Sequence, residues 1–301
     1  VFAALILQKA ATSGFFMPVS AIIWRVAALI KRKENLMITV SIVTYKTDLA
    51  ELEKCLASLS CGLVERIFVV DNAKEQRMED FCRRHGVEYI GSENVGYGAG
   101  HNKAIRRAME LGAEYHLVVN TDVRFEPAVL EKLAEYMDGN PQVGQVQPKV
   151  VYPSGELQYT CRMLPTPWIL ALRRFVPKGL TGKYDDRYLL KFRDHDKPMD
   201  VPYHQGSFMF FRVASLKEIG LFDERFFMYP EDIDISRRMH KRFATMYWPG
   251  VTVVHDHRAA SYKNWRMLKV HIVNMIRYFN KWGWLFDRER TAWNKQLLEN
   301  S

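Results

Sequence analysis

The chain has 301 residues, 48% of them hydrophobic and 13% aromatic, which is enough to close the core of one large α/β domain or two smaller ones. This composition excludes an intrinsically disordered chain and a miniprotein held together by disulfides. The 43 Lys and Arg residues against 34 Asp and Glu residues give a net charge of +9, which favours nucleotides, lipid head groups or nucleic acid as partners without choosing among them. The four cysteines show no C-x-x-C spacing, so we expect free thiols and a reducing cytoplasm.

Residues 1–36 form an apolar segment that ends in basic residues. Two charged residues and a proline interrupt its apolar run, which therefore falls short of the roughly 18 residues that span a bilayer. The basic cluster at 31–33 follows the apolar stretch, whereas a secretory signal carries its positive charge first, so we reject a signal peptide. Two interpretations stay open: an interfacial anchor, or upstream sequence that is not part of the native protein. We prefer the second, since the chain opens with Val and Met37 stands just before the first convincing strand.

From Met37 onward, β-branched runs alternate with helical patterns. The predicted elements are, in chain order, strand 38–45, helix 48–59, strand 66–70, helix 75–84, strand 87–90, a glycine-rich loop, helix 102–111, strand 115–119 and helix 127–137. Asp48 and Glu51 have the spacing of a capping box, and Pro127 suits a first helical turn. The alternation predicts an α/β fold with a Rossmann-like, mostly parallel sheet flanked by helices.

The pattern loosens after Val143. We expect a hairpin near 150–160, an unassigned basic stretch at 162–202, strand 207–212, helix 214–219, loop 220–230, a helix from Glu231 and strand 251–255. The tail at 262–300 places Trp265, Leu268, Ile272, Met275 and Phe279 at helical spacing, with basic residues among them. This spacing predicts a C-terminal amphipathic helical tail.

Polar residues stand where the predicted strands end, which is where ligands bind in parallel sheets. Asp71 could accept hydrogen bonds from a nucleobase or ribose, although a turn or cap role explains it at least as well. The glycine-rich run 94–102 leads into a helix and could present backbone N–H groups to an anion, or be a flexible turn. It is neither a dinucleotide fingerprint nor a P-loop.

Acidic residues and a histidine form the second group of candidates. Asp122 follows a buried strand and suits a hard divalent cation that bridges two phosphates, the alternative being an ordinary turn. Glu231, Asp232 and Asp234 repel one another, which raises at least one pKa unless a cation or substrate answers them, although acids also favour helix N-termini. His255 could complete a metal site begun by Asp122 or be a surface histidine, and its spacing excludes structural zinc.

Taken in order, these stretches resemble family 2 glycosyltransferases of the GT-A fold, especially the bacterial rhamnosyltransferase-like branch that builds surface polysaccharides. The matching pieces are 40–45, 69–73, 93–98, 120–123, 204–207, 220–227, 231–234 and 253–255. The resemblance covers 38–257 and implies a catalytic domain at 37–257, with a nucleotide-binding half at 37–147 and an acceptor half at 148–257. The N-terminal segment 1–36 precedes it, and the basic tail 258–301 follows.

The resemblance also implies a role for individual residues. The donor-binding residues it implies are Thr44, Tyr45, Asp71, Asn94, Gly96, Asn120 and Asp122. Asp122 and His255 would hold Mn²⁺ or Mg²⁺, with His257 as the alternative to His255, and Asn120-Thr121-Asp122 lacks the first acid of the family's D-x-D motif. Asp232 matches the catalytic base. Glu231, Gly206 and Ser207 would lie on the acceptor side, with Glu231 as the second catalytic candidate.

The implied reaction moves a sugar from a dTDP-rhamnose or UDP-sugar type of donor to a hydroxyl of a growing glycan. Direct displacement by that hydroxyl inverts the anomeric centre, with a metal offsetting charge on the leaving diphosphate and Asp232 taking the proton. By family analogy the acceptor sits on a polyprenyl diphosphate lipid, and the enzyme is cytoplasmic. The tail then contacts the membrane peripherally or packs on the catalytic domain, and both can hold.

Two rival functions stay open. A sugar-nucleotide pyrophosphorylase would need a basic glycine-rich signature in its first βα loop, which residues 45–48 do not provide. A non-catalytic basic module that binds nucleic acid or membrane is supported by the net charge alone. It leaves Asp122, Glu231 and Asp232 unexplained, so we expect no nucleic-acid partner.

Overall fold

The computed structural model describes residues 36–256 and 265–299. Most of the N-terminal segment, His257 and both ends of the tail therefore lie outside the described residues. The chain divides at Met37, and the fold below belongs to the compact unit Ile38–Ser301. Among the described helices, none is long and apolar enough to cross a membrane.

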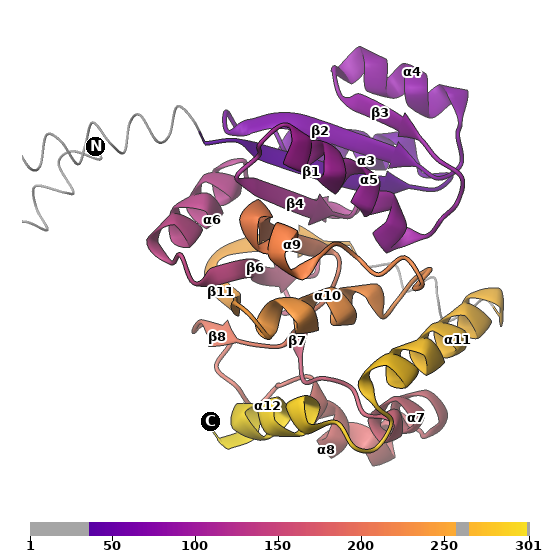
Figure 1. Cartoon of the computed structure of the whole chain (residues 1–301), viewed down its shortest axis with the longest axis vertical. Coiled ribbons are helices and arrows are strands. Elements are labelled where there is room, and N and C mark those ends of the chain that lie inside the picture. The colour runs from indigo at the N-terminus through magenta and orange to yellow at the C-terminus, as the bar shows by residue number, and fades with distance from the viewer. Residues whose placement is uncertain (1–35, 257–264, 300–301) are drawn as a thin grey trace, which may run out of the picture. The chain divides into compact units, whose positions relative to one another are not determined.

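A mixed but mostly parallel sheet forms the centre of this unit (Figure 1). Its strands are β1 (Ile38–Thr44), β2 (Val64–Asp71), β3 (Glu88–Gly91), β4 (Tyr115–Val119), β5 (Val123–Arg124), β6 (Val143–Val151), β8 (Met199–Asp200), β10 (Phe208–Arg212) and β11 (Ala244–His255). The order is β3-β2-β1-β4-β10-β6-β11-β5, with β8 beside β11. β10, β5 and β8 run antiparallel to their neighbours, while the other strands share one direction. This is the expected α/β GT-A architecture.

Helices cover both faces of the sheet. They are α3 (Leu49–Ser58), α4 (Gln76–His85), α5 (Tyr97–Glu110), α6 (Ala128–Gly139), α9 (Val213–Ile219) and α10 (Glu231–His240). On one face, α5, α9 and α10 share a buried cluster with β4 and β10 that includes Ile105, Phe211 and Ile235. On the other face, Tyr115 of β4 stacks on Phe210 and hydrogen-bonds Asp138 of α6.

The glycine-rich run 94–102 is a loop only as far as Gly96 and is helical from Tyr97. Helix α5 begins at Tyr97, five residues before the predicted start, and includes Gly98 and Gly100. A Cβ atom at Gly98 would stand 2.8 Å from Phe222 Cβ, and one at Gly100 would stand 2.9 Å from a Val43 methyl carbon. These glycines therefore serve close packing of α5 on the sheet and on the 220–230 loop, not flexibility.

The capping box is only half formed. Asp48 caps α3 by accepting a hydrogen bond from the Ala50 N–H at 3.0 Å, as predicted. Glu51 instead accepts a hydrogen bond from the Thr121 hydroxyl at 2.6 Å. Glu51, which the sequence pattern assigns to the helix cap, therefore hydrogen-bonds the loop after β4 instead.

The stretch left unassigned at 162–202 is largely ordered. It contains α7 (Pro167–Phe175) and α8 (Lys178–Tyr188), and a two-stranded ribbon pairs β7 (Cys161–Arg162) with β9 (Tyr203–His204). The predicted hairpin after β6 turns at 152–156 and returns through one isolated bridge, Val151 to Leu157. β11 starts seven residues before the predicted 251, because a register irregularity between Trp248 and Thr252 accommodates Pro249 and Gly250.

The tail consists of two helices packed on the catalytic domain. They are α11 (Trp265–Trp282) and α12 (Arg288–Glu299), and Gly283, with φ of 99°, separates them. Arg237 of α10 pairs with Asp287 through two hydrogen bonds of 2.7 Å, and its guanidinium lies 4.0 Å from the Trp282 ring centroid. Figure 1 shows α7, α8, α11 and α12 gathered at one end of this unit. The packed-helix interpretation therefore holds for one side of the tail.

Candidate active site

Strand pairing brings Asp122 and His255 together across 133 residues of sequence. β5 pairs with the end of β11, so His255 lies opposite Val123, and His255 Nε2 is 3.3 Å from Asp122 Oδ1. Gln158 brackets the imidazole: its Oε1 lies 2.9 Å from His255 Nδ1, and its Nε2 donates to the His255 carbonyl oxygen. Because an amide oxygen only accepts, this contact places a proton on Nδ1, and Nε2 is the ring nitrogen that faces Asp122.

This pair supplies two of the ligands that a divalent cation needs. Within residues 36–256 and 265–299, no three His, Cys, Asp or Glu side chains are grouped to hold a metal ion. One carboxylate and one imidazole fit Mn²⁺ or Mg²⁺ when the diphosphate oxygens of a substrate and water complete the shell. His257 lies outside the described residues, so the structure bears only on His255.

Tyr97 connects the metal side of the site to the acceptor side. Its hydroxyl donates to the Gly206 carbonyl oxygen at 2.6 Å and lies 2.9 Å from Asn120 Oδ1. The Asn120 N–H donates to the Ser207 carbonyl oxygen at 3.0 Å. Sequence analysis did not single out Tyr97, although it lies in the glycine-rich run 94–102. The side-chain direction of a residue at the start of a helix depends on how that helix packs, which a sequence pattern does not show.

Asp232 is a buried carboxylate held in a fixed orientation. The Gly206 N–H donates to its Oδ2 at 2.9 Å and the Ile233 N–H donates to its Oδ1 at 2.7 Å. Burial raises the pKa of Asp232 to about 7, while these hydrogen bonds and the charge of Arg162 oppose a further rise. A carboxylate that titrates near neutral pH is suited to accept a proton from a substrate hydroxyl.

The charge of Glu231 depends on that of its neighbour. Burial and the charge of Asp232 raise the pKa of Glu231 well above its usual value, so the two carboxyls disfavour carrying two charges at once. Its Oε2 is buried without a hydrogen-bond partner among the described residues. The Ser207 hydroxyl, also buried, has no partner within that same part of the chain. Both groups therefore keep hydrogen-bonding capacity that the described residues do not use.

Asp234, the third acid, has a structural role. It accepts hydrogen bonds from Arg238 at 2.9 Å and from the Trp282 indole at 2.8 Å, and Lys281 Nζ lies 2.6 Å away. These partners lie on α10 itself and on α11, so Asp234 ties the base-bearing helix to the tail. Of the three acids, only Glu231 and Asp232 are placed for chemistry.

Arg162 is a second residue that the sequence did not single out. It lies on β7 opposite Tyr203, with its guanidinium 5.7 Å from that ring centroid, and Nη2 donates to Gln205 Oε1 at 3.3 Å. Its charge opposes the rise in the pKa of Asp232 that burial causes. Only the pairing of β7 with β9 reveals this, since Arg162 and Asp232 are 70 residues apart.

The predicted donor residues line the carboxyl edge of β1 and β2, but their exposure differs. Thr44 and Asp71 are opposite each other in the strand register and both are buried. The Asp71 carboxylate accepts hydrogen bonds from Thr44 Oγ1 at 3.2 Å and from the backbone N–H groups of Ala73 and Glu75 at 3.0 and 2.7 Å. Asp71 therefore stabilises the turn after β2, which is the structural role considered for it as the alternative to donor binding. Tyr45 and Asn94 are exposed and stay predictions as donor contacts.

At Gly96, the loop that precedes α5 passes close to the 220–230 loop. Its φ is 98°, a Cβ there would stand 2.2 Å from the Phe227 carbonyl oxygen, and the neighbouring Tyr97 N–H donates to that oxygen at 2.9 Å. Asn102 Nδ2 donates to the Phe222 carbonyl oxygen at 2.9 Å. The 220–230 loop is therefore fastened to α5 just before Glu231. Gly96 thus allows the backbone before α5 to approach the Phe227 carbonyl group closely. Its predicted contact with the donor stays a prediction.

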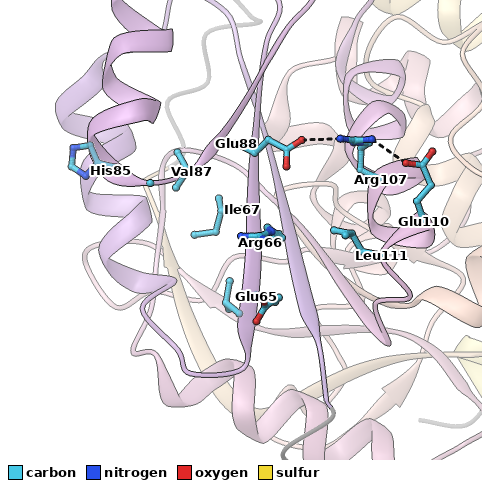
Figure 2. Close-up of a pocket in the computed structure, with 11 residues that line it drawn as sticks. Glu65, Arg66, Ile67, His85, Val87, Glu88, Arg107, Glu110 and Leu111 are labelled. Carbon is cyan, nitrogen blue, oxygen red and sulfur yellow. Dashed lines mark hydrogen bonds and ion pairs between the residues drawn. The ribbon is translucent and has the colours of Figure 1, made fainter.

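A separate hollow of about 620 Å³ lies away from these residues (Figure 2). It is lined by the start of β2, including Arg66, and by the end of α5, where Arg107 lies between Glu88 and Glu110. These are the amino ends of the parallel strands, whereas ligands bind at the carboxyl ends. We therefore place the active site at Asp122, His255, Glu231 and Asp232.

Comparison with known proteins bears on the family and the fold of the chain. The family model described as Glycosyl transferase family 2 matches residues 39–220. A Mycobacterium tuberculosis protein named N-acetylglucosaminyl-diphospho-decaprenol L-rhamnosyltransferase is 27% identical over 238 residues, covering 73% of this chain and 75% of that protein.

Two solved structures share the fold. Mannosyltransferase PcManGT from Pyrobaculum calidifontis, in complex with GDP-Man and Mn²⁺, aligns at a TM-score of 0.53 and 18% identity, covering 84% of this chain and 70% of its own. GalNAc-T7 with UDP, GalNAc and Mn²⁺ aligns at a TM-score of 0.55 and 13% identity, covering 75% of this chain but only 44% of that longer one. At these identities the likeness concerns the fold alone.

Proposed function

The chain belongs to glycosyl transferase family 2, and we propose that it transfers a sugar from a nucleoside diphosphate donor to a hydroxyl of a growing surface glycan with inversion. The observation that carries the proposal is that the site contains two separate features. One is a buried carboxylate of pKa about 7, Asp232, and the other is the contact between the Asp122 carboxylate and the His255 imidazole. The first suits proton removal and the second suits a metal-bound diphosphate.

On the donor side, Asp122 and His255 would hold Mn²⁺ or Mg²⁺ against the diphosphate. A divalent cation there offsets the negative charge that grows on the leaving oxygen, so no acid proton is needed. Gln158 keeps the His255 ring oriented for this contact. Thr44, Tyr45, Asp71 and Asn94 lie along the edge where base and ribose would bind, and the donor class remains a dTDP-rhamnose or UDP-sugar type.

On the acceptor side, Asp232 removes the proton of the attacking hydroxyl. The N–H groups of Gly206 and Ile233 hold the carboxylate, and Arg162 favours its ionised form. Glu231 Oε2 and the Ser207 hydroxyl, which have no hydrogen-bond partner among the described residues, hydrogen-bond the acceptor sugar. Attack on the face opposite the leaving diphosphate inverts the anomeric centre.

The proposed acceptor is a glycan carried on a polyprenyl diphosphate lipid. This follows from the acceptor named for the Mycobacterium tuberculosis relative, a diphospho-decaprenol, rather than from any bound group. Such a lipid lies in the cytoplasmic membrane, so we place the enzyme in the cytoplasm with peripheral contact to the inner face, through the basic tail.

Donor turnover tests this function. The chain is incubated with nucleotide sugars, Mn²⁺ and lipid-linked or soluble glycan acceptors, and released nucleoside diphosphate and the anomeric configuration of the product are measured. We expect acceptor-dependent nucleoside diphosphate release that stops when EDTA is added, and an inverted linkage. Release of pyrophosphate from a sugar phosphate and a nucleoside triphosphate would instead support a pyrophosphorylase. No turnover of any donor would refute the proposal.

A further inference from the structure

Helix α11 carries more apolar side chains than the domain covers. Met275, Tyr278 and Phe279 face the domain and are buried. Trp265, Ile272 and Ile276 follow at spacings of seven and four residues along the edge of the same apolar stripe, and they are exposed. The domain therefore uses only part of this stripe.

The α11–α12 turn and α7 add further exposed apolar groups. Trp168 of α7 is 73% exposed, Leu285 is 69% exposed and Phe286 is 95% exposed, so packing among residues 36–256 and 265–299 does not account for them. A hollow of about 430 Å³ between α7 and the turn is lined by Pro167, Trp168, Ala171, Trp284 and Leu285. The inner sides of α7 and α11 share one buried cluster, which holds the two helices together. We call the set Trp168, Trp265, Ile272, Ile276, Leu285 and Phe286 the apolar face.

The helices of the apolar face carry basic residues and no acidic ones: Arg173, Arg174, Arg266, Lys269, Arg277 and Lys281. Arg173 pairs with Asp185 of α8, and Lys281 pairs with Asp223 and Asp234. The cations that can reach lipid phosphates are the exposed ones, Arg174, Arg266, Lys269 and Arg277. The acid of the turn, Asp287, is buried against Arg237. Exposed Trp, Phe and Ile mixed with Lys and Arg is the composition of surfaces that sit in the head-group region of anionic membranes.

The same helix holds the loop that leads to the base. Asn274 Nδ2 donates to the Met228 carbonyl oxygen at 3.0 Å, and Arg277 Nη1 donates to the Arg225 carbonyl oxygen at 2.7 Å. Asp232 follows four residues after Met228. A surface in contact with the exposed edge of α11 thus lies roughly one helix diameter, about 10 Å, from this loop.

We propose that the apolar face, built from α7, α11 and the α11–α12 turn, docks on an anionic lipid bilayer and thereby sets Asp232 next to the head-group region. The inference rests on the proposed function for its lipid-linked acceptor, and it extends the membrane contact from the basic tail to a defined surface that includes α7. Apolar side chains enter the bilayer interface while the basic residues contact lipid phosphates.

A fluorescent label tests the contact directly in the full chain. The four cysteines are all buried, so a thiol-reactive nitrobenzoxadiazole dye attaches selectively to the variant Phe286→Cys. With vesicles of equal parts phosphatidylcholine and phosphatidylglycerol, we expect a blue-shifted emission that a lipid-soluble quencher reduces. The matched control is Phe192→Cys, also exposed but outside the apolar face, which should not respond. An unchanged signal at position 286, or equal signals at both positions, would overturn the proposal.

A surface variant tests the consequence for catalysis. Replacing Trp168, Leu285 and Phe286 together by Ser should lower the vesicle partition coefficient roughly tenfold or more, because each side chain loses its burial in lipid. The control variant, Leu111→Ser with Phe192→Ser, should bind as the parent does. The triple variant should keep transfer to a soluble acceptor and lose transfer to a vesicle-bound one.

The outcomes separate this inference from the proposed function. If neither acceptor is glycosylated while the label at position 286 enters lipid, the function is wrong and the membrane surface stands. If both acceptors are glycosylated while the label stays silent, the function stands and the surface is wrong. A triple variant that turns a dimer into a monomer without changing vesicle binding would make the apolar face an interface between copies.

Discussion

Replacing Asp232 by Asn removes the proposed base with the least change in shape. The Gly206 and Ile233 N–H groups each donate to one carboxylate oxygen, so the amide can accept only one of these hydrogen bonds. The unmatched N–H costs about 1–3 kcal/mol of stability. Relief of the buried charge at neutral pH opposes this loss, and we expect the variant to fold and to bind donor and metal.

The kinetic effect should be much larger than the effect on stability. A positioned general base contributes about 10²–10⁴-fold, so kcat should fall by roughly that factor if proton removal limits the rate. This corresponds to about 3–5 kcal/mol in the activation barrier. The capping alternative predicts a different result: loss of a helix-terminal carboxylate would change stability by about 1 kcal/mol and leave turnover intact.

The pH dependence has a defined sign. A base acts when ionised, so the kcat of the parent should rise with pH through about 7, the pKa of Asp232, and the Asn variant should lack this limb. The folded-state pKa lies above the usual 3.8, so the stability associated with this carboxyl is fully present below 3.8 and is lost as pH rises through about 7. The parent should therefore lose more stability than the variant between these values.

Three measurements decide among these outcomes. Steady-state kinetics with varied acceptor gives kcat and KM, calorimetric titration gives donor binding, and thermal melts give stability. Glu231→Gln is the matched control, since a protonated Glu231, which its raised pKa favours, has nearly the shape and donor capacity of Gln. It should raise the acceptor KM and change kcat by less than about tenfold. Near-parental turnover in Asp232→Asn, or an unchanged pH limb, would refute the assignment of Asp232 as the base.

Three other changes test the metal site, the loop crossing and the tail. Asp122→Ala should abolish the Mn²⁺-dependent part of donor binding while melting as the parent does, and calorimetry that shows unaltered Mn²⁺ dependence would contradict the metal assignment. Gly96→Ala should lower the melting temperature and turnover together, because its Cβ would stand 2.2 Å from the Phe227 carbonyl oxygen; a parental melt would show that the crossing relaxes freely. Arg237→Ala should cost about 3–5 kcal/mol in urea unfolding, because the buried Asp287 loses two hydrogen bonds of 2.7 Å and keeps, among the described residues, only Arg290 as a cationic partner, with Nε at 3.9 Å. The control Arg225→Ala should cost less than about 1 kcal/mol, because the Arg225 guanidinium is exposed and Asp223 keeps its ion pair with Lys281.

The sequence by itself determined the fold class and the edge that carries the site. β-branched runs that end in Thr44, Asp71 and Asn120 could be read directly, because the period of apolar residues and the polar residue after each run are local properties. The joint order of the motifs likewise pointed to family 2 glycosyltransferases. Asp122 and Asp232 follow from the same motifs as predicted site residues, and they stay predictions.

The helical content of the glycine-rich run and of residues 162–202 could not be read in this way. Gly98 and Gly100 suggest a loop by propensity, but α5 needs them because Phe222 and Val43 approach its backbone. Propensity is worth about 1 kcal/mol per glycine, so tertiary packing easily overrides it. The positions of Arg162 and Tyr97 were also not readable from the sequence. The pairing of β7 with β9 places Arg162, and the start of α5 places Tyr97.

The tail shows the division most clearly. Helical spacing correctly predicted an amphipathic helix, but it assigned Trp265, Ile272, Met275 and Phe279 to one apolar side. In the structure Met275 and Phe279 are buried against the domain, while Trp265 and Ile272, at the edge of the same apolar stripe, are exposed. Periodicity measures how apolar residues are spaced around a helix, and the partner on each side depends on contacts such as Asp234 with Lys281 and Trp282. Those contacts join segments about 50 residues apart, so only the tertiary structure decides which apolar groups form the core and which remain for a membrane.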